Sequence, residues 1–235
     1  MISTCREEIN SSLHCIICED GSQTFFNTKY NEAYHSKIGP ITEARHKFVN
    51  PSCLEELIAE NKKVRILDLF FGLGYNTGIT LDTAYKISNN PQIEIVAIEK
   101  DIEIIRKIQD LEVPDWYKKW RDFLGGITNQ ITSSHENISI TLCLECIFNA
   151  IEKLPNEYFD IIYFDPFSHK VTPEFWTDNF LKSVFKLLTQ GGTLTTYSGL
   201  KRVAKLACEE GFIVRQIEPI GRKKNSLAIV RKTLY

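Results

Sequence analysis

Two glycines and three acidic residues stand directly after apolar, β-rich runs of the sequence, where strands would end. Gly72 and Gly74 follow the first run, Glu99 ends the second, and Glu145 and Asp165 follow the third and fourth. The carboxyl ends of parallel strands share one crevice, so we expect these residues to converge. Glycine lets a ligand approach the backbone closely, and a carboxylate can accept the protons of both ribose hydroxyls. The pattern predicts a site for a nucleotide-like cofactor.

The spacing of the glycines favours S-adenosylmethionine over a dinucleotide. A dinucleotide fingerprint has its third glycine three residues after the second, whereas Gly78 comes one residue later. With S-adenosylmethionine as the cofactor, we expect Glu99 to bind the ribose and Glu145, with the Cys146 amide, to contact the adenine edge. Asp165 would lie nearest the methyl group. Two structural alternatives remain: Glu99 can end a strand in solvent, and Asp165 can cap the turn that follows it.

Seven β-rich runs and the helical patterns between them predict an α/β fold. The predicted strands are 64–69, 93–99, 138–144, 159–164, 193–197, 212–217 and 226–231. The predicted helices are 75–87, 101–110, 146–154, 173–190 and 199–210, the fourth capped by Thr172 and ended by Gly191 and Gly192. No helix separates the last two strands, which indicates an antiparallel hairpin at the sheet edge. A Rossmann-like, seven-stranded sheet with an antiparallel edge is typical of class I S-adenosylmethionine-dependent methyltransferases.

Residues 1–60 are predicted to form a small cap, and residues 61–235 the methyltransferase domain. Asp20 and Gly21 lie between two apolar runs, which is a hairpin signal. Residues 30–39 are polar and aromatic without a clear period, so they are predicted as loop. Short helices are expected over 40–48 and from residue 51 onward.

The composition indicates an ordinary globular protein of the cytoplasm. The chain has 235 residues and a net charge of −2, which excludes a uniformly basic nucleic-acid binder but not a local basic patch. No apolar run approaches the roughly 20 residues that span a bilayer, and the first residues do not resemble a signal peptide. The seven cysteines include two pairs with C-x-x-C spacing, at 15 and 18 and at 143 and 146. Both pairs lie in apolar segments, which favours buried thiols over a zinc site, so no metal is expected.

Several segments together resemble the methyltransferase part of the MnmC family. They are Asp20–Thr24, Tyr34–Gly39, Thr42–Phe48, Phe71–Gly74, Phe164–Thr177 and Gly221–Lys224, in the order of that family. The family completes 5-methylaminomethyl-2-thiouridine at the wobble position of certain tRNAs. The resemblance implies an S-adenosylmethionine-dependent methylation of the 5-aminomethyl group. It covers no FAD oxidase half, so we expect a stand-alone form whose substrate comes from a separate upstream enzyme.

The resemblance also implies roles for individual residues. Asp165 and Phe167 would be catalytic, Asp165 by accepting a hydrogen bond from the amine and Phe167 by stacking on the uracil ring. The implied cofactor-binding residues are Phe71, Gly72, Gly74, Asn76, Glu99, Glu145, Cys146 and Asp165. The implied substrate or tRNA contacts are Glu43, His46, Lys170, Arg222, Lys223 and Lys224. Phe167 as a core residue, and the basic run as a solvated turn, are the structural alternatives.

The segment around Asp165 departs from the family pattern. Many members have Asp-Gly-Phe-Ala-Pro where this chain has Asp165, Pro166, Phe167, Ser168 and His169, and Asp where Glu145 stands. Because the Asp and Phe are kept, the reaction is expected to be kept as well. Two other functions fit the same sequence features. One is an aminopropyltransferase of the spermidine synthase type, which uses decarboxylated S-adenosylmethionine, and the other is a non-catalytic RNA-binding module.

Overall fold

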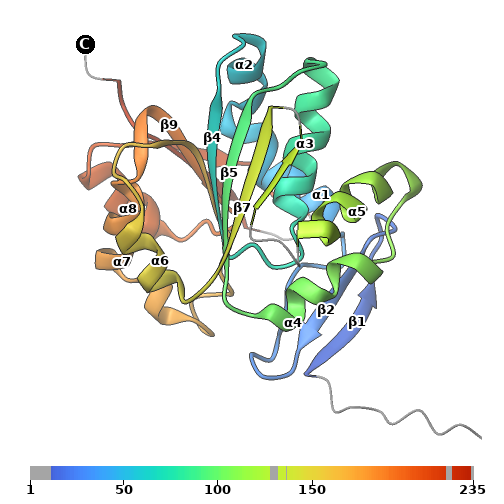
Figure 1. Cartoon of the computed structure of the whole chain (residues 1–235). Helices are drawn as coiled ribbons and strands as arrows, with labels where there is room; N and C mark the ends of the chain where they lie inside the picture. The colour runs from blue at the N-terminus through green and yellow to red at the C-terminus, as the bar shows by residue number, and fades with distance from the viewer. Residues whose placement is uncertain (1–11, 128–131, 136, 221–223, 234–235) are drawn as a thin grey trace, which may run out of the picture.

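A twisted sheet forms the centre of the computed structural model, which describes residues 12–127, 132–135, 137–220 and 224–233 (Figure 1). Within these residues the sheet has eight strands in the order β10-β11-β9-β8-β4-β5-β7-β6. The strands are β4 Val64–Leu69, β5 Ile93–Glu99, β6 Thr132–His135, β7 Ile138–Leu144, β8 Phe159–Phe164, β9 Leu188–Thr196, β10 Ile213–Ile217 and β11 Ser226–Val230.

The strand directions confirm the predicted fold class. The strands β7, β5, β4, β8 and β9 run parallel to one another. The last strand, β11, inserts between β9 and β10 and is antiparallel to both. All seven predicted strands are present, and β6 adds an eighth, antiparallel to β7 at the opposite edge. The sequence of β6, Thr-Ser-Ser-His, lacks the apolar alternation that would have predicted it.

Helices cover both faces of the sheet, and each face has its own buried apolar cluster. Along β4, Ile66 belongs to the cluster under α2, α3 and α5, and Leu67 to the cluster under α6, α7 and α8 (Figure 1). This alternation follows from the two-residue period of a strand. The helices are α2 Leu54–Ala59, α3 Tyr75–Ile87, α4 Ile102–Arg106, α5 Lys118–Ile127, α6 Ile147–Lys153, α7 Asp178–Phe185 and α8 Lys201–Glu209, with 3₁₀ turns η3 Ile108–Asp110, η4 Asp115–Tyr117 and η5 Pro173–Trp176.

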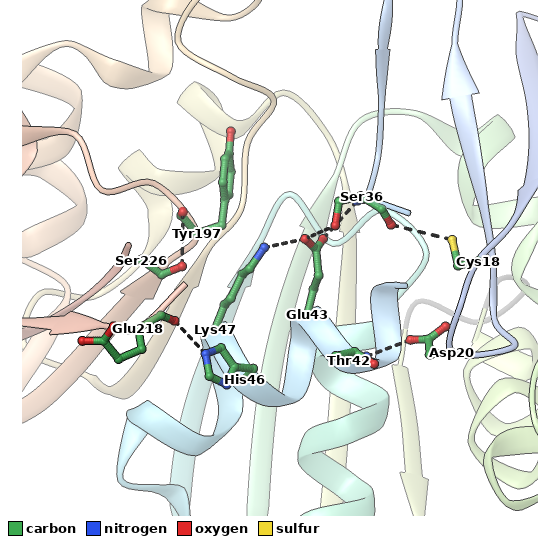
Figure 2. A network of polar contacts seen from close by, with 10 residues as sticks. All are labelled: Cys18, Asp20, Ser36, Thr42, Glu43, His46, Lys47, Tyr197, Glu218 and Ser226. Carbon is green, nitrogen blue, oxygen red and sulfur yellow. Dashed lines mark hydrogen bonds and ion pairs between the residues drawn. The ribbon is translucent and has the colours of Figure 1, made fainter. Parts of the chain in front are cut away.

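The N-terminal segment is a small antiparallel sheet followed by helical turns. The predicted hairpin at Asp20 and Gly21 is confirmed, since β1 pairs with β2 there. Asp20 also accepts a hydrogen bond from the Thr42 amide at 2.9 Å, and so ties the hairpin to the first helix (Figure 2). Phe25 and Phe48 belong to the buried cluster that contains Ile66. The elements are β1 Leu13–Ile17, β2 Gln23–Asn27, β3 Glu32–Ala33, α1 Pro40–Glu43, the π-helical η1 Ala44–Val49 and the 3₁₀ turn η2 Asn50–Ser52.

The single helix predicted over 173–190 is wrong. Thr172 makes no side-chain cap, and Pro173–Trp176 form only a 3₁₀ turn. The helix α7 begins after Thr177, whose hydroxyl accepts a hydrogen bond from the Phe180 amide, and ends at Phe185. Gly191 does not end a helix, because it lies inside β9 with φ +78°.

The prediction of buried thiols is confirmed only for Cys18, and Cys143 is half-buried. Cys15 is exposed on β1, which lies at the edge of the small sheet, and Cys146 is exposed in front of α6. In the part of the chain that the structure describes, no three His, Cys, Asp or Glu side chains form a group that could hold a metal ion. None of the helices there combines the length and apolar character that a membrane crossing requires.

Candidate active site

A pocket lies at the carboxyl ends of β5, β7 and β8, with the N-terminal segment over it. Six residues predicted from the sequence share its lining, including three acids from three different strand ends. This is the convergence expected at the carboxyl edge of a parallel sheet. The pocket is lined by Tyr30, Glu32, Ala33, Tyr34, Glu43, Phe48, Phe70, Ile98, Glu99, Lys100, Asp101, Glu145, Cys146, Ile147, Asp165, Pro166, Phe167, Thr172, Phe175 and Tyr197.

The turn after β4 contains three residues with positive φ angles. Phe70 has φ +66°, Gly72 +56° and Gly74 +72°. Gly74 is the residue before α3, and a Cβ there would lie 2.6 Å from the ring of Phe71, so only glycine fits. Phe71 itself is buried at 6% exposure. In this arrangement it shapes the turn, while the glycines keep the backbone open beside the pocket.

Glu99 connects this turn to the loop after β5. Its Oε2 accepts a hydrogen bond from the Gly72 amide at 3.0 Å, and its Oε1 accepts from the amides of Lys100 and Asp101 at 2.8 and 2.9 Å. Burial raises the pKa of the Glu99 carboxyl above its ordinary value, and the three backbone amides oppose that rise. Glu99 is therefore fixed in position at the edge of the pocket.

Asp165 leaves the end of β8 beside the start of α3. Its Oδ2 accepts a hydrogen bond from Asn76 Nδ2 at 3.2 Å, which brings together two residues predicted separately. Below them, Asp68 is fully buried and accepts a hydrogen bond from the Thr77 hydroxyl at 2.7 Å. Burial, with a further contribution from Asp165, raises the pKa of Asp68 to about 8. Asp68 was not predicted as part of the site, although an acid inside an apolar strand indicates a buried polar role.

Phe167 sits in an aromatic cluster that the N-terminal segment completes. The rings of Tyr30 and Tyr34 each lie 4.9 Å from the Phe167 ring, centroid to centroid. Glu32 holds the same loop, since its carboxylate accepts hydrogen bonds from the Ser168 amide and hydroxyl at 3.2 and 2.6 Å. Residues 30–39 were predicted only as loop. The density of aromatic residues there was the available signal.

Glu43 enters the pocket from α1 and is held in a buried polar network (Figure 2). It forms an ion pair with Lys47 and accepts hydrogen bonds from the Ser36 hydroxyl and amide at 2.6 and 3.2 Å. Burial acts to raise the pKa of Glu43, but Lys47, His35 and the Ser36 hydrogen bonds outweigh it and lower that pKa below its ordinary value. Glu43 is therefore held as a carboxylate, and the buried Lys47 balances its charge.

The remaining predicted residues lie outside the pocket or at its edge. Glu145 lines the pocket and pairs with Lys153 at 2.5 Å. His46 donates a hydrogen bond to the Glu218 carbonyl at 2.7 Å (Figure 2). It lines a different groove. Lys170 and Lys224 are exposed. The other two basic candidates lie outside the described residues: Arg222 and Lys223.

Known proteins resemble this chain in both sequence and structure. It is 28% identical over 214 residues to an uncharacterized protein of Methanocaldococcus jannaschii, covering 88% of this chain and 56% of that protein. It is 23% identical to the tRNA 5-methylaminomethyl-2-thiouridine biosynthesis bifunctional protein MnmC of Paraburkholderia xenovorans, over 87% of this chain and 33% of that protein. The chain thus spans about half and about a third of these two relatives.

Two solved structures share the fold to different degrees. MNMC2 from Aquifex aeolicus aligns with a TM-score of 0.84 and 29% identity, covering 97% of this chain and 74% of that one. A probable spermidine synthase from Corynebacterium glutamicum aligns with a TM-score of 0.57 and 15% identity, over 94% of this chain and 76% of that one, a likeness of fold alone. A family model for S-adenosyl-L-methionine-dependent methyltransferases matches residues 107–232. The chain therefore belongs to the S-adenosyl-L-methionine-dependent methyltransferase family and has an MnmC methyltransferase-like domain.

Proposed function

We propose that this protein methylates the amine of 5-aminomethyluridine, or of its 2-thio form, at the wobble position of tRNA, and so forms the 5-methylaminomethyl group. One observation carries the proposal: Asp165, Phe167 and Glu99 line a single pocket in which tyrosine rings pack against Phe167. A pyrimidine with an alkyl amine needs an aromatic surface for its ring and an acid for its amine. The similarity to the tRNA 5-methylaminomethyl-2-thiouridine biosynthesis bifunctional protein MnmC of Paraburkholderia xenovorans supports this choice of substrate.

The residues around the glycine turn fit S-adenosylmethionine, which supplies an electrophilic methyl group when bound. Gly72 and Gly74 keep Cβ atoms away from the backbone beside Glu99. The Glu99 carboxylate is already oriented by three backbone amides, so it can accept ribose hydroxyls without reorganising. Glu145 and Cys146 stand at the next strand end, where the adenine edge would lie.

Asp165 and Phe167 would position the substrate. Alkyl amines are mostly protonated near neutral pH, so the site must take up a proton or favour the free amine. Asp165, oriented by Asn76, would accept a hydrogen bond from the amine and so direct its lone pair. Phe167 would stack on the uracil ring, and Tyr30 and Tyr34 would hold Phe167 in place. Holding the amine and the methyl group in line can lower the activation barrier of the transfer by at most about 7–11 kcal/mol.

The wider assignment follows from the same proposal. A wobble nucleotide is unpaired and can enter a pocket, while basic residues such as Lys170 and Lys224 contact the backbone beside it.

We assign residues 1–60 as a cap and 61–235 as the catalytic domain. The aminomethyl substrate would come from a separate upstream enzyme, and the reaction would take place in the cytoplasm. No resident metal is part of the proposed site.

Mass spectrometry of wobble nucleosides tests the proposal directly. Hypomodified tRNA that carries the 5-aminomethyl group is incubated with the pure protein and S-adenosylmethionine, digested and analysed. We expect the wobble nucleoside to gain one methyl group. Matched reactions without S-adenosylmethionine, or with tRNA whose wobble uridine lacks the aminomethyl group, should remain unchanged. An unaltered aminomethyl nucleoside in the complete reaction would reject the proposed substrate.

A second candidate function is aminopropyl transfer, because the fold is shared with a probable spermidine synthase. The two functions differ in the cofactor that the pocket must accept, which is S-adenosylmethionine for methyl transfer and its decarboxylated form for aminopropyl transfer. We expect calorimetry to show tighter binding of S-adenosylmethionine than of its decarboxylated form, and the reverse order would favour aminopropyl transfer. A non-catalytic RNA-binding module would bind RNA with no measurable affinity for either compound.

A further inference from the structure

A second groove lies behind the helical segment that supplies Glu43 to the pocket. Residues 40–50 border both hollows: Glu43 and Phe48 line the pocket, whereas Arg45 and His46 line the groove. The other wall of the groove comes from Lys86 at the end of α3, a helix that Figure 1 shows beside α1, and from Trp116 in the turn η4. The groove is lined by Ile41, Thr42, Arg45, His46, Asn50, Lys86, Trp116 and Ile220.

Trp116 is the unusual feature of this groove. Its side chain is 44% exposed, whereas Trp120 and Trp176, the other two tryptophans, are 8% and 1% exposed. The Arg45 guanidinium and the Lys86 ammonium each lie 5.5 Å from the centre of the Trp116 ring. A half-exposed indole with two cations close to its ring is suited to stack on a flat group whose neighbours are anionic.

The charges around Trp116 leave the groove positive. Arg45 and Lys86 share one acid, Asp82, at 3.4 and 2.6 Å. The Asp82 side chain is only 5% exposed, while those of Arg45 and Lys86 are 40% and 60% exposed. Trp120 also donates a hydrogen bond to Asp82. The acid thus orients the two cations from beneath, and their outer faces remain available to an anion.

We propose that this groove binds the unpaired RNA strand a few nucleotides from the one held in the pocket, with a base stacked on Trp116 and phosphates near Arg45 and Lys86. The inference rests on the proposed tRNA substrate and adds a second contact surface to it. An RNA strand fits better than an apolar peptide, because the aromatic surface is bordered by cations. Residues 40–50 border both hollows, and Lys86 stands about 15 Å along α3 from Asn76, which contacts the pocket residue Asp165, so a strand of a few nucleotides would connect the two sites.

Tryptophan fluorescence offers a test that does not depend on methyl transfer. The whole chain is titrated with an unmodified anticodon stem-loop RNA, and we expect quenching that comes from Trp116. Trp116→Phe should remove most of the quenching yet retain part of the affinity, whereas Trp116→Ala should weaken RNA binding about 5- to 100-fold. Binding of S-adenosylmethionine by calorimetry should be unchanged in both variants, which shows that the fold is intact.

Salt dependence tests the role of the cations. Arg45→Gln and Lys86→Gln, made singly so that Asp82 keeps one partner, should each lower the slope of log affinity against log salt by about 0.7, the value for one phosphate contact on a single strand. Lys205→Gln is a matched control, because Lys205 is 77% exposed on α8, which covers the opposite face of the sheet. Its slope should equal that of the wild type.

The outcomes separate this inference from the proposed function. If tRNA is methylated but Trp116→Ala binds RNA as tightly as the wild type, the groove inference is rejected and the proposed function stands. If RNA quenches Trp116 in the wild type and no aminomethyl nucleoside is methylated, the groove inference stands and the proposed substrate is rejected. If the stem-loop RNA does not bind the wild type at all, the groove inference is rejected.

Discussion

Asp165 stands at the end of β8, where Asn76 holds one of its carboxylate oxygens at 3.2 Å. We predict that Asp165→Asn lowers the rate of methyl transfer by about 10²- to 10⁴-fold, since the amide keeps the shape but accepts a proton poorly. Binding of S-adenosylmethionine should change little. Single-turnover methylation and calorimetry measure the two quantities. Asp178→Asn is the control, as Asp178 is exposed and pairs with Arg202, and wild-type turnover in Asp165→Asn would remove the proposed role.

Asp68 makes the stability of the protein depend on pH. Burial raises the pKa of Asp68 from 3.8 to about 8, so the folded state holds a proton that the unfolded state releases. The stability that this proton contributes is complete below about pH 4 and is lost as the pH rises to about 8. We predict that Asp68→Asn, which cannot ionise, loses less stability than the wild type between pH 5 and pH 8. Urea unfolding at both pH values measures this, and equal losses would contradict the prediction.

At the scale of elements, Gly78 in α3 lets Tyr117 of the turn η4 pack closely against this helix. A Cβ on Gly78 would lie 2.0 Å from the hydroxyl oxygen of Tyr117, which is buried in η4. We predict that Gly78→Ala destabilises the protein by about 1–3 kcal/mol, because the added methyl group overpacks this contact. Chemical denaturation measures the change.

Gly126 is the matched control for this prediction. It lies in α5, and a Cβ there would meet no atom within 4 Å. Gly126→Ala should therefore stabilise the protein, by about 0.5–1 kcal/mol. A loss of stability in Gly126→Ala as large as that in Gly78→Ala would show that the contact with Tyr117 is not the cause of the loss.

The elements also show which features of the site a sequence can predict. Gly72, Glu99 and Asp165 were predicted because each stands at or just after the end of a buried strand, and a strand is recognised from a few consecutive residues. The interruption between Trp176 and Asp178 was missed, since it depends on the Thr177 hydroxyl binding the Phe180 amide in place of continuing the helix. The packing of Tyr34 against Phe167 was missed as well. It joins residues 133 positions apart, and no local pattern contains such a contact.

At the scale of the whole molecule, the N-terminal segment and the sheet form the pocket jointly. Glu32 binds the loop that carries Phe167, and Glu43 projects from the first helix into the same space. Among the residues that line this pocket the acids outnumber the one base, Lys100, so an acid can take up the proton of an incoming ammonium before the amine attacks. A tRNA is a polyanion, so its backbone must be held elsewhere on the surface.

The C-terminal part of the chain offers the charge for that contact. From Gly211 onward the sequence has six Lys and Arg and one acid, Glu218, although the whole chain has a net charge of −2. We predict that changing Arg222, Lys223 and Lys224 together to Ala weakens tRNA binding and lowers the salt slope by about 2–3, as the loss of three phosphate contacts would. Filter binding of tRNA at several salt concentrations measures the slope, and Lys205→Ala is the control. An unchanged slope in the triple variant would exclude this segment from the tRNA interface and leave the positive charge beside Trp116 as the stronger candidate.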